Sequence, residues 1–314
     1  MPKVLIADAL APRAAELLIE GGMKVETRLK MKPEELTAAL RDGGYDAILV
    51  RSDTKLTRAV LEQAQGLELI VRAGVGLDNV DVAAAQERGI HVTNTPAATT
   101  TSVAELVIGL MLGLARRIPA ADRSVRAGQW ERKAFMGREL RDATLGVLGL
   151  GRIGGEVARI AMAMGMRVIA YDPYMTTAQM AAQNVTAQSI EQVLHDADVL
   201  TIHLPLTDET ANIINRERML TMTRGAFIIN AARGGVLDEA ALADMLREGQ
   251  IGGAALDVYE SEPPKPDNPL LTLANADPNI NIIFTPHIGA STNEGQVTAA
   301  IQAAQIVLDF FKQH

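Results

Sequence analysis

The chain has 314 residues, of which 48% are hydrophobic, so it can bury a sizeable core and is expected to form two domains. Its formal net charge of -8 argues against nucleic acid or an anionic membrane surface as a partner, because both bind clustered positive charge. It contains no cysteine, which excludes disulfides, thiolate nucleophiles and sulfur-rich metal sites. We predict no metal site.

The beginning of the chain and its most apolar stretch bear on where the protein resides. Residues 1–8 are typical of a first strand and lack the basic start, long apolar run and cleavage site of a signal peptide. Residues 103–115 are strongly apolar, but they include Glu105 and are fewer than the roughly 20 apolar residues that span a bilayer. We therefore expect a cytoplasmic protein that does not enter a membrane.

Short β-branched runs alternate with helical patterns along the chain, which is typical of parallel sheets linked by crossover helices. The alternation occurs twice and predicts an α/β fold of two doubly wound parallel-sheet domains. In the first half, strands are expected at residues 4–7, 24–27, 47–50, 69–71 and 91–93, with helices such as residues 33–40 between them. In the second half, strands are expected at residues 144–148, 167–171, 199–202, 227–230, 253–256 and 280–284.

Two long helices define the expected domain boundaries. Residues 99–102 offer an N-cap to an apolar helix that continues to Leu114 and connects the two halves. The last amphipathic helix, from about residue 292 to 311, has no strand after it and could return to the first domain. We predict a discontinuous domain of residues 1–97 plus 290–314 and a second domain of residues 98–289. The proline-rich residues 261–269 are predicted to form a loop.

A glycine-rich loop follows a predicted strand of the second half directly. Gly149, Gly151 and Gly154 form a GxGxxG pattern, and a helix is predicted to begin with Arg152 and Ile153. The first glycine permits a tight turn, the second lets the backbone approach a pyrophosphate, and the third allows close packing of helix on strand. The first N–H groups of the helix and its dipole would bind the phosphates. This loop predicts a dinucleotide site.

The acidic residue that completes such a site is Asp172, about 20 residues beyond the glycines at the end of the next strand. A carboxylate there binds the ribose 2′-hydroxyl and repels the 2′-phosphate of NADP, so NAD is the predicted cofactor. An isolated glycine motif would only shape a turn; here the strand, the helix and the acid stand in register. Gly74 and Gly76 also follow a strand, but the next strand ends on Asn94, so we assign that loop to the substrate side.

Three polar residues follow predicted strands of the second half and could carry out hydride transfer from a secondary alcohol. That reaction needs a base for the hydroxyl proton, a group that orients the base and a cation for a substrate carboxylate. His287 could be the base, Glu262 its carboxylate partner and Arg233 the bidentate cation. A lone histidine is more often structural, so spacing by itself leaves this assignment open.

The remaining histidines are weaker candidates for the base. His91 begins a strand, His195 stands on a solvated helix, and His314 is the terminus. His203 ends a strand and is predicted to line the nucleotide pocket rather than to act in proton transfer.

Five blocks of the sequence, in the same order, resemble those of the D-isomer-specific 2-hydroxyacid dehydrogenases. The resemblance covers essentially the whole chain and implies a flavodoxin-like substrate domain, a Rossmann NAD domain and a cleft between them. It also implies that Arg233 binds the substrate, that Glu262 partners the histidine and that His287 exchanges the proton. The matching blocks are residues 71–81, 149–154, 230–235, 255–258 and 286–292.

The same resemblance extends the expected NAD site. It implies that Arg152, Ile153 and Asp172 bind the adenosine and phosphate part. The residues implied to lie beside the nicotinamide are Ala231, Asp257, Gly289 and Ala290.

The substrate is predicted from fewer residues. The segment 130–137 resembles the branch of the family that oxidises 3-phosphoglycerate in the first step of serine biosynthesis. A phosphate group requires Arg, Lys or N–H donors. Alternatively, Arg132 and Lys133 form only a solvated basic turn. The candidate substrate-binding residues are Arg51, Arg72, Ala73, Gly74, Asn94 and Arg132.

Other functions on the same scaffold stay open at this stage. One is a reductase of glyoxylate, hydroxypyruvate or D-lactate, and another is a non-enzymatic NAD-binding sensor or corepressor. The resemblance further implies a homodimer formed through the apolar helix at residues 103–114. Long members of the family carry regulatory domains after the catalytic core, and because this chain ends at His314 we expect no feedback through such a domain.

Overall fold

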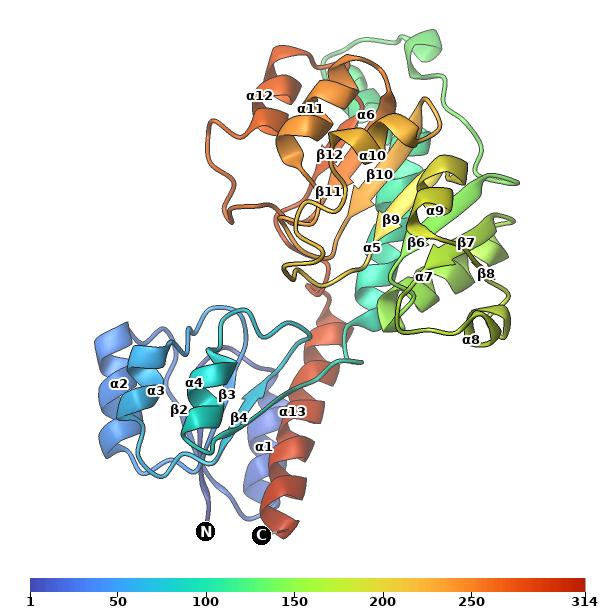
Figure 1. The fold of residues 1–314 in the computed structure, drawn as a ribbon. Helices are drawn as coiled ribbons and strands as arrows, with labels where there is room; N and C mark the ends of the chain where they lie inside the picture. The colour runs from blue at the N-terminus through green and yellow to red at the C-terminus, as the bar shows by residue number, and fades with distance from the viewer. Residues whose placement is uncertain (314) are drawn as a thin grey trace. The chain divides into compact units, whose positions relative to one another are not determined.

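The computed structural model describes residues 1–313, so His314 lies outside the described residues. The chain divides into two compact units (Figure 1). Unit 1 comprises Met1–Thr100 and the C-terminal segment that begins at Ala290, and unit 2 comprises Thr101–Gly289. The last helix of the chain thus belongs to the same unit as the first strand.

Unit 1 is built on a five-stranded parallel sheet with the order β2-β1-β3-β4-β5. Its strands are β1 (Lys3–Ile6), β2 (Lys24–Thr27), β3 (Ala47–Val50), β4 (Leu69–Arg72) and β5 (His91–Asn94). Its helices are α1 (Pro12–Glu20), α2 (Pro33–Asp42), α3 (Arg58–Gln63), α4 (Val82–Glu87) and α13 (Asn293–Gln313).

Both faces of this sheet are buried because alternate side chains of each strand pack against different helices. Val4 and Ile6 of β1 pack with α1 and α13, whereas Leu5 packs with α2, α3 and α4. On α13 the contacts come from alanines such as Ala300 and Ala304, whose small side chains let the helix approach the sheet closely. Helices on both faces make this a doubly wound unit.

Unit 2 is built on a seven-stranded parallel sheet with the order β12-β11-β10-β9-β6-β7-β8. Its strands are β6 (Thr144–Leu148), β7 (Arg167–Tyr171), β8 (Thr186–Ala187), β9 (Val199–Ile202), β10 (Ala226–Asn230), β11 (Ile251–Leu256) and β12 (Ile282–Phe284). Its helices are α5 (Thr100–Ala115), α6 (Ile118–Arg126), α7 (Arg152–Ala163), α8 (Thr177–Ala181), α9 (Ile190–Asp196), α10 (Arg216–Thr221), α11 (Glu239–Arg247) and α12 (Pro269–Ala276), with the 3-10 turn η1 (Arg132–Phe135).

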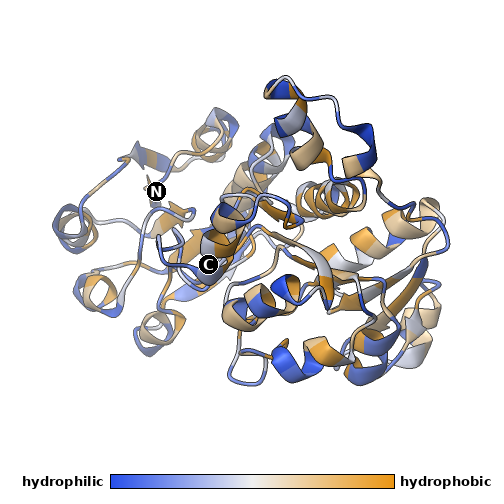
Figure 2. Cartoon of the chain, turned by 90° about the horizontal axis from the view of Figure 1, so that it is seen from above, coloured by the Kyte–Doolittle hydropathy of each residue, from blue (hydrophilic) through white to orange (hydrophobic). Residues whose placement is uncertain are grey.

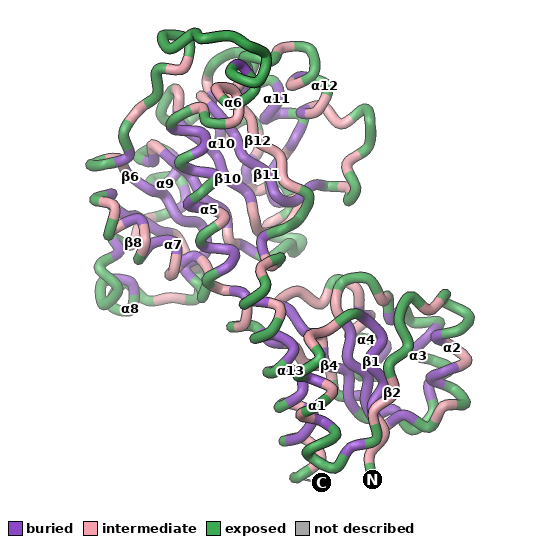
Figure 3. The backbone as a smooth tube through the Cα atoms, turned by 180° about the vertical axis from the view of Figure 1, so that it is seen from behind, coloured by how far each residue is buried: buried purple, intermediate pink, exposed green. Residues whose placement is uncertain are grey.

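The strands of unit 2 form its core, and helices again cover both faces of the sheet. Val147 and Ile229 pack with α5 and α7, while Leu148 and Ile228 pack with α9, α10 and α11. The hydrophobic strands stand out in Figure 2, and Figure 3 shows that they are buried. The predicted fold class of two doubly wound parallel-sheet domains is confirmed.

The structure differs from the sequence prediction in several elements. The edge strand β8 and helix α6 were not predicted, and β11 begins at Ile251 rather than at residue 253. Pro269 is the first residue of α12 and not part of the preceding loop. A proline is well suited to the first helical position, where its missing N–H would have no intrahelical partner.

The apolar character of helix α5 is explained by its packing within unit 2. Val103, Val107, Met111 and Leu114 are buried, and they pack on the face of the sheet that also receives α7. Among the described residues no helix combines the length and apolarity that a membrane crossing requires.

Candidate active site

The predicted cofactor and catalytic residues of unit 2 all follow the carboxyl ends of its strands. Gly149 follows β6, His203 follows β9, Arg233 follows β10, Asp257 follows β11 and His287 follows β12. Because every strand is parallel to its neighbours, these ends lie at one edge of the sheet. The order of strands reverses between β6 and β9, which is the position where open α/β sheets bind nucleotides.

The geometry of the glycine loop fits a dinucleotide. Gly149 has a φ of 89°, and a Cβ there would lie 2.9 Å from the carbonyl oxygen of His203. A Cβ on Gly154 would lie 2.1 Å from the carbonyl oxygen of Gly149, so α7 can pack this closely only on glycine. A Cβ on Gly151, by contrast, would meet nothing within 4 Å. The loop therefore leaves open space at the glycine predicted to face the pyrophosphate.

Asp172 holds the glycine loop in place. One oxygen of its carboxylate accepts the N–H of Leu150 at 2.8 Å, and the other accepts the N–H of Tyr174 at 2.9 Å. Arg152 begins α7 on the exposed side of the loop, while Ile153 packs partly into the core. The carboxylate is thus fixed next to the loop, and each of its oxygens keeps a lone pair for a ribose hydroxyl.

His203 presents an unpaired ring nitrogen beside this loop. Its Nε2 lies 3.0 Å from the hydroxyl of Thr201, whereas its Nδ1 is buried and has no partner. Burial lowers the pKa of His203 to about 4, so the ring is neutral near pH 7. A buried polar atom without a partner is uncommon in a folded protein and is consistent with a ligand that supplies the hydrogen bond.

The predicted catalytic pair is formed in the structure. Nδ1 of His287 lies 2.6 Å from Oε2 of Glu262, and both side chains are partly exposed. The second carboxylate oxygen, Oε1, accepts the N–H of Tyr259 at 3.2 Å. Because Nδ1 is occupied by the carboxylate, Nε2 is the ring nitrogen that remains for a substrate.

The backbone at His287 is unusual and is held by a buried carboxylate. His287 has a φ of 51°, in the left-handed region that residues other than glycine rarely adopt. Asp257 is only 1% exposed, and it accepts the N–H groups of Ile288 and Gly289, both at 2.8 Å, and the hydroxyl of Thr285 at 2.6 Å. The residue that we expected beside the nicotinamide therefore also fixes the loop of the base.

Tyr259 and Gly234 connect the three catalytic loops. The Tyr259 hydroxyl donates to the carbonyl oxygens of Thr285 and Leu256. Burial raises the pKa of Tyr259 to about 12, so this hydroxyl keeps its proton at every physiological pH. A Cβ on Gly234 would lie 1.8 Å from the carbonyl oxygen of Tyr259, so the loop of Arg233 touches the loop of Glu262 backbone to backbone.

Arg233 is held at the start of its loop by Asn230. The Asn230 amide donates to the carbonyl oxygen of Arg233 at 2.9 Å and accepts the N–H of Ala232 at 3.1 Å. Nη1 of Arg233 donates to the carbonyl oxygen of Ala232 at 2.7 Å. Ala231, which we expected beside the nicotinamide, lies within this turn at the same edge of the sheet.

In unit 1, most of the predicted substrate residues gather at the carboxyl edge of the five-stranded sheet. Arg51 follows β3, Arg72 ends β4 with Gly74 close behind, and Asn94 ends β5 and donates to the carbonyl oxygen of Val75. Gly74 has a φ of 153°, and a Cβ there would lie 2.4 Å from Nη1 of Arg72, so this position leaves room for the guanidinium.

One predicted donor of this group has to be corrected. The N–H of Ala73 donates to the carbonyl oxygen of Val50 at 2.8 Å and continues the ladder between β3 and β4. It is therefore not available to a phosphate. The sequence could not show this, because the last ladder bond of a strand depends on how far its neighbour extends.

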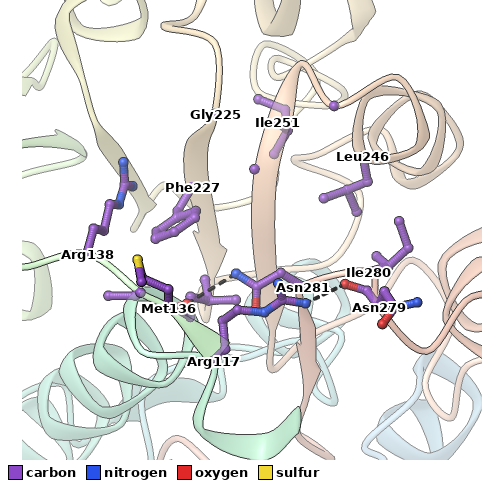
Figure 4. A pocket seen from close by; sticks show the side chains of 15 residues that line it. Arg117, Met136, Arg138, Gly225, Phe227, Leu246, Ile251, Asn279, Ile280 and Asn281 are labelled. Atoms are coloured by element: carbon purple, nitrogen blue, oxygen red, sulfur yellow. Dashed lines mark hydrogen bonds between the residues drawn. The ribbon is translucent and has the colours of Figure 1, made fainter. Parts of the chain in front are cut away.

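Arg132 is the one predicted substrate residue of unit 2, and its contact with a phosphate stays a prediction. It stands on η1 and lines a shallow hollow with Trp130 and Phe135. The chain then runs to the amino edge of the sheet, where residues 136–138 line a pocket of about 480 Å³ (Figure 4). This pocket lies at the opposite end of the strands from His287.

Several polar groups of that amino-edge pocket bind the protein itself, although Nε of Arg117 and Nε of Arg138 are buried without a partner. Arg117 donates to the carbonyl oxygen of Asn279 at 2.8 Å, and Asn281 donates to that of Leu114 at 3.1 Å (Figure 4). The guanidinium carbon of Arg138 lies 3.8 Å from the ring centroid of Phe227. These contacts close the end of α5 against the sheet and indicate a structural role.

Sequence reasoning missed two residues that support the site, and it missed one contact set of a third. Tyr259 and Asn230 bind main-chain groups of the catalytic loops, and Asp257 was expected to serve the cofactor alone. Position at a strand end was a signal for Asn230 and Asp257. Tyr259 carried none, since its contact with the loop of His287 is to Thr285, 26 residues further along the chain.

Because the folded protein keeps the His203 ring neutral, we predict how the free energy of unfolding depends on pH. An unfolded histidine takes up a proton below pH ~6.5, whereas folded His203 resists protonation down to about pH 4. The contribution of His203 to the free energy of unfolding is therefore complete above the pKa of a histidine in the unfolded chain. It is lost as the pH falls towards 4. That loss is at most roughly 3 kcal/mol, because part of the residue reaches the surface. The free energy of unfolding in urea should fall less between pH 7 and pH 4.5 for His203→Asn than for the natural protein. An equal fall in both proteins would refute this account.

Comparison with known proteins agrees with the geometry. The NAD binding domain of the D-isomer specific 2-hydroxyacid dehydrogenases matches residues 108–289. D-3-phosphoglycerate dehydrogenases from Methanocaldococcus jannaschii and Archaeoglobus fulgidus are 49% and 45% identical, over 97% and 99% of this chain. The chain spans 56% and 57% of those two relatives, or little more than half of their length.

A solved structure supports the cofactor. The D-lactate dehydrogenase from Aquifex aeolicus, in complex with NAD and lactic acid, has a TM-score of 0.83 and 30% identity. The similarity covers 99% of this chain and 96% of that one. NAD is accordingly the cofactor, and the glycine loop and Asp172 stay the residues predicted to bind it. With more than half of its length matched by the family's NAD binding domain, the chain belongs to the D-isomer-specific 2-hydroxyacid dehydrogenases.

Proposed function

We propose that this protein oxidises 3-phosphoglycerate at C2 to 3-phosphohydroxypyruvate with NAD⁺. The observation that carries the proposal is the pair formed by His287 and Glu262, which leaves one imidazole nitrogen for a hydroxyl proton at the edge of the sheet where NAD binds. The name of the two archaeal relatives supports the substrate. When bound, NAD⁺ supplies the acceptor for the hydride that leaves C2.

Each catalytic residue has a defined task in this proposal. Nε2 of His287 takes the hydroxyl proton as the C2–H bond breaks, and Glu262 stabilises the imidazolium that results. Arg233 binds the substrate carboxylate with its planar guanidinium. Asp257 keeps the His287 loop in its strained conformation, so that the base is placed before substrate arrives.

The remaining contacts of NAD and substrate are proposed from the same expectations. Gly289 and Ala290 would border the nicotinamide, and Gly289 is already placed by its bond to Asp257. Arg51, Arg72, Gly74 and Asn94 would bind the phosphate, since they share the carboxyl edge of the sheet in unit 1. A contribution of Arg132 to phosphate binding stays a prediction of the sequence.

The substrate assignment is tested by steady-state kinetics on a panel of 2-hydroxy and 2-keto acids. We expect kcat/KM for 3-phosphoglycerate to exceed that for D-glycerate by at least about a hundredfold, because a phosphate contributes several charge-assisted hydrogen bonds. A higher kcat/KM for glyoxylate, hydroxypyruvate or D-lactate would refute the assignment of 3-phosphoglycerate as the substrate. NADH binding without turnover of any compound would instead favour a sensor or corepressor.

The role of the base is tested by His287→Ala. This variant should lower kcat by about 10² to 10⁴ fold, which is the usual contribution of a general base, while the Kd for NADH stays within about twofold. His195→Ala, a change of an exposed histidine on α9, is the matched control and should keep full activity. Undiminished turnover in His287→Ala would refute the assignment.

We also propose that the protein forms a homodimer through the surface near the end of α5. Large apolar side chains are exposed there in close succession, on α5, α6 and the segment around η1. A second copy is the occupant that the resemblance to dimeric dehydrogenases implies. The exposed residues are Leu112, Ile118, Val125, Trp130 and Met136. A cytoplasmic location remains a prediction of the sequence.

Light scattering after size exclusion tests the dimer. The natural protein should elute with twice the mass of the chain. Trp130→Asp, which places a charge on a side chain that is 76% exposed, should shift the protein to the monomer mass at low micromolar concentration. Leu220→Asp on α10 is the control for an exposed apolar residue outside this surface. A monomeric natural protein would contradict the proposal.

A further inference from the structure

A buried carboxylate that the proposed reaction does not use lies beneath the loop that carries Glu262. Glu239 is the first residue of α11 and is only 3% exposed, which is rare for a glutamate. Burial raises the pKa of its carboxyl group. The positive end of α11 compensates part of the cost of burying this charge.

Both oxygens of Glu239 bind the segment that carries Glu262. Oε1 accepts the N–H of Glu260 at 2.7 Å, and Oε2 accepts the side-chain amide of Asn268. Glu260 and Asn268 stand near the two ends of that segment, before and after Glu262. One carboxylate thus fixes the loop at both of its ends.

The loop between these two points has little other support. Residues 260–268 contain three prolines and form neither helix nor strand, so they make no ladder of backbone hydrogen bonds. Glu262 receives one bond from the residue before the loop, from the N–H of Tyr259, and otherwise depends on where the loop is held. Its distance of 2.6 Å to Nδ1 of His287 must therefore be set by the anchors of the loop.

The orientation of the Asn268 amide is fixed by a second task. Its Oδ1 accepts the N–H groups of Leu270 and Leu271 and so caps α12. Only its NH₂ group is left for Glu239, which means that position 239 must offer an acceptor. If Asn268 turned its amide to meet a donor, the cap would be lost.

We infer that Glu239 is a positioning residue for the catalytic pair: by binding Glu260 and Asn268, it holds Glu262 against His287. This inference rests on the proposed function, in which that pair transfers the proton. Glu239 acts through Glu262 and touches neither substrate nor NAD. The inference adds a buried anchor to the catalytic machinery described above.

An exchange of donor and acceptor tests the inference. In Glu239→Gln the new NH₂ faces the NH₂ of Asn268, and in Asn268→Asp two carboxylates face each other. In the double variant the glutamine donates to the aspartate, which still caps α12, while the glutamine oxygen still accepts the N–H of Glu260. The net charge of the double variant equals that of the natural protein.

We expect kcat to fall in each single variant and to recover in the double variant. Each single change should lower kcat by between about tenfold and a hundredfold through misplacement of Glu262, with the Kd for NADH unchanged. The double variant should recover to within about threefold of the natural kcat. Glu248→Gln, at the other end of α11, is the control for loss of one charge and should keep full activity. Normal kcat in both single variants would overturn the inference.

A readout without turnover separates this inference from the proposed function. The proton shared by Nδ1 of His287 and Glu262 should give a far-downfield NMR signal that His287→Ala identifies. This signal should weaken or vanish in Glu239→Gln and return in the double variant. Its persistence in Glu239→Gln would overturn the positioning role, whereas a normal signal in a natural protein without turnover would refute only the proposed function.

Loss of folding is the other reason for a single variant to fail, so thermal unfolding is followed for each protein. Asn268→Ser provides a second route, because its hydroxyl can still cap α12 but cannot reach Glu239 as the amide does. A folded Asn268→Ser should show the same loss of kcat and of the NMR signal as Asn268→Asp. If it is folded and behaves like the natural protein, the inference fails.

Discussion

The candidate site depends on a carboxylate to which the proposed mechanism gives no part in proton transfer. Asp257 is buried at the end of β11, and it binds three donors on the loop that follows β12. These bonds hold His287 in a left-handed conformation that would otherwise be unfavourable by roughly 1–3 kcal/mol. Without them the imidazole would have no fixed direction towards Glu262. The pairing of β11 with β12 thus determines where the base stands.

The catalytic loops are stabilised mainly by contacts with one another. Tyr259 bonds to the loop of the base, Gly234 touches the backbone of Tyr259, and Glu239 holds the segment of the acid from below. Few of these contacts involve residues close in sequence. Such a network is rigid only when every member is satisfied, since a single buried unpaired group is costly.

The sequence predicted the parts of the structure that depend on local rules. Alternation of strands and helices predicted the fold class, which is confirmed, and the GxGxxG loop with Asp172 predicted a turn geometry that fits a dinucleotide. The pair of Glu262 and His287 was predicted through resemblance, and the 2.6 Å contact agrees with it. The short strand β8 has only two residues and was missed, since a pattern of two residues has no period.

What the sequence could not predict depends on distant contacts. The N–H of Ala73 is bound to β3, and this does not follow from the residues nearby. Nothing in the local sequence marks Glu239 as an anchor, because its partners lie 21 and 29 residues further along the chain. Position in sequence identified which residues could react, but not which residues hold them in place.

The contact between Gly234 and Tyr259 restricts how this protein can change its substrate. Since no side chain fits at position 234, the loop of Arg233 cannot be altered there without displacing the backbone that leads to Glu262. Variation that recognises a new acid must therefore arise elsewhere, for instance in the loops of unit 1, where Arg72 and Asn94 end their strands. A side chain introduced at position 234 by laboratory evolution would displace this backbone, whereas libraries in unit 1 leave it untouched.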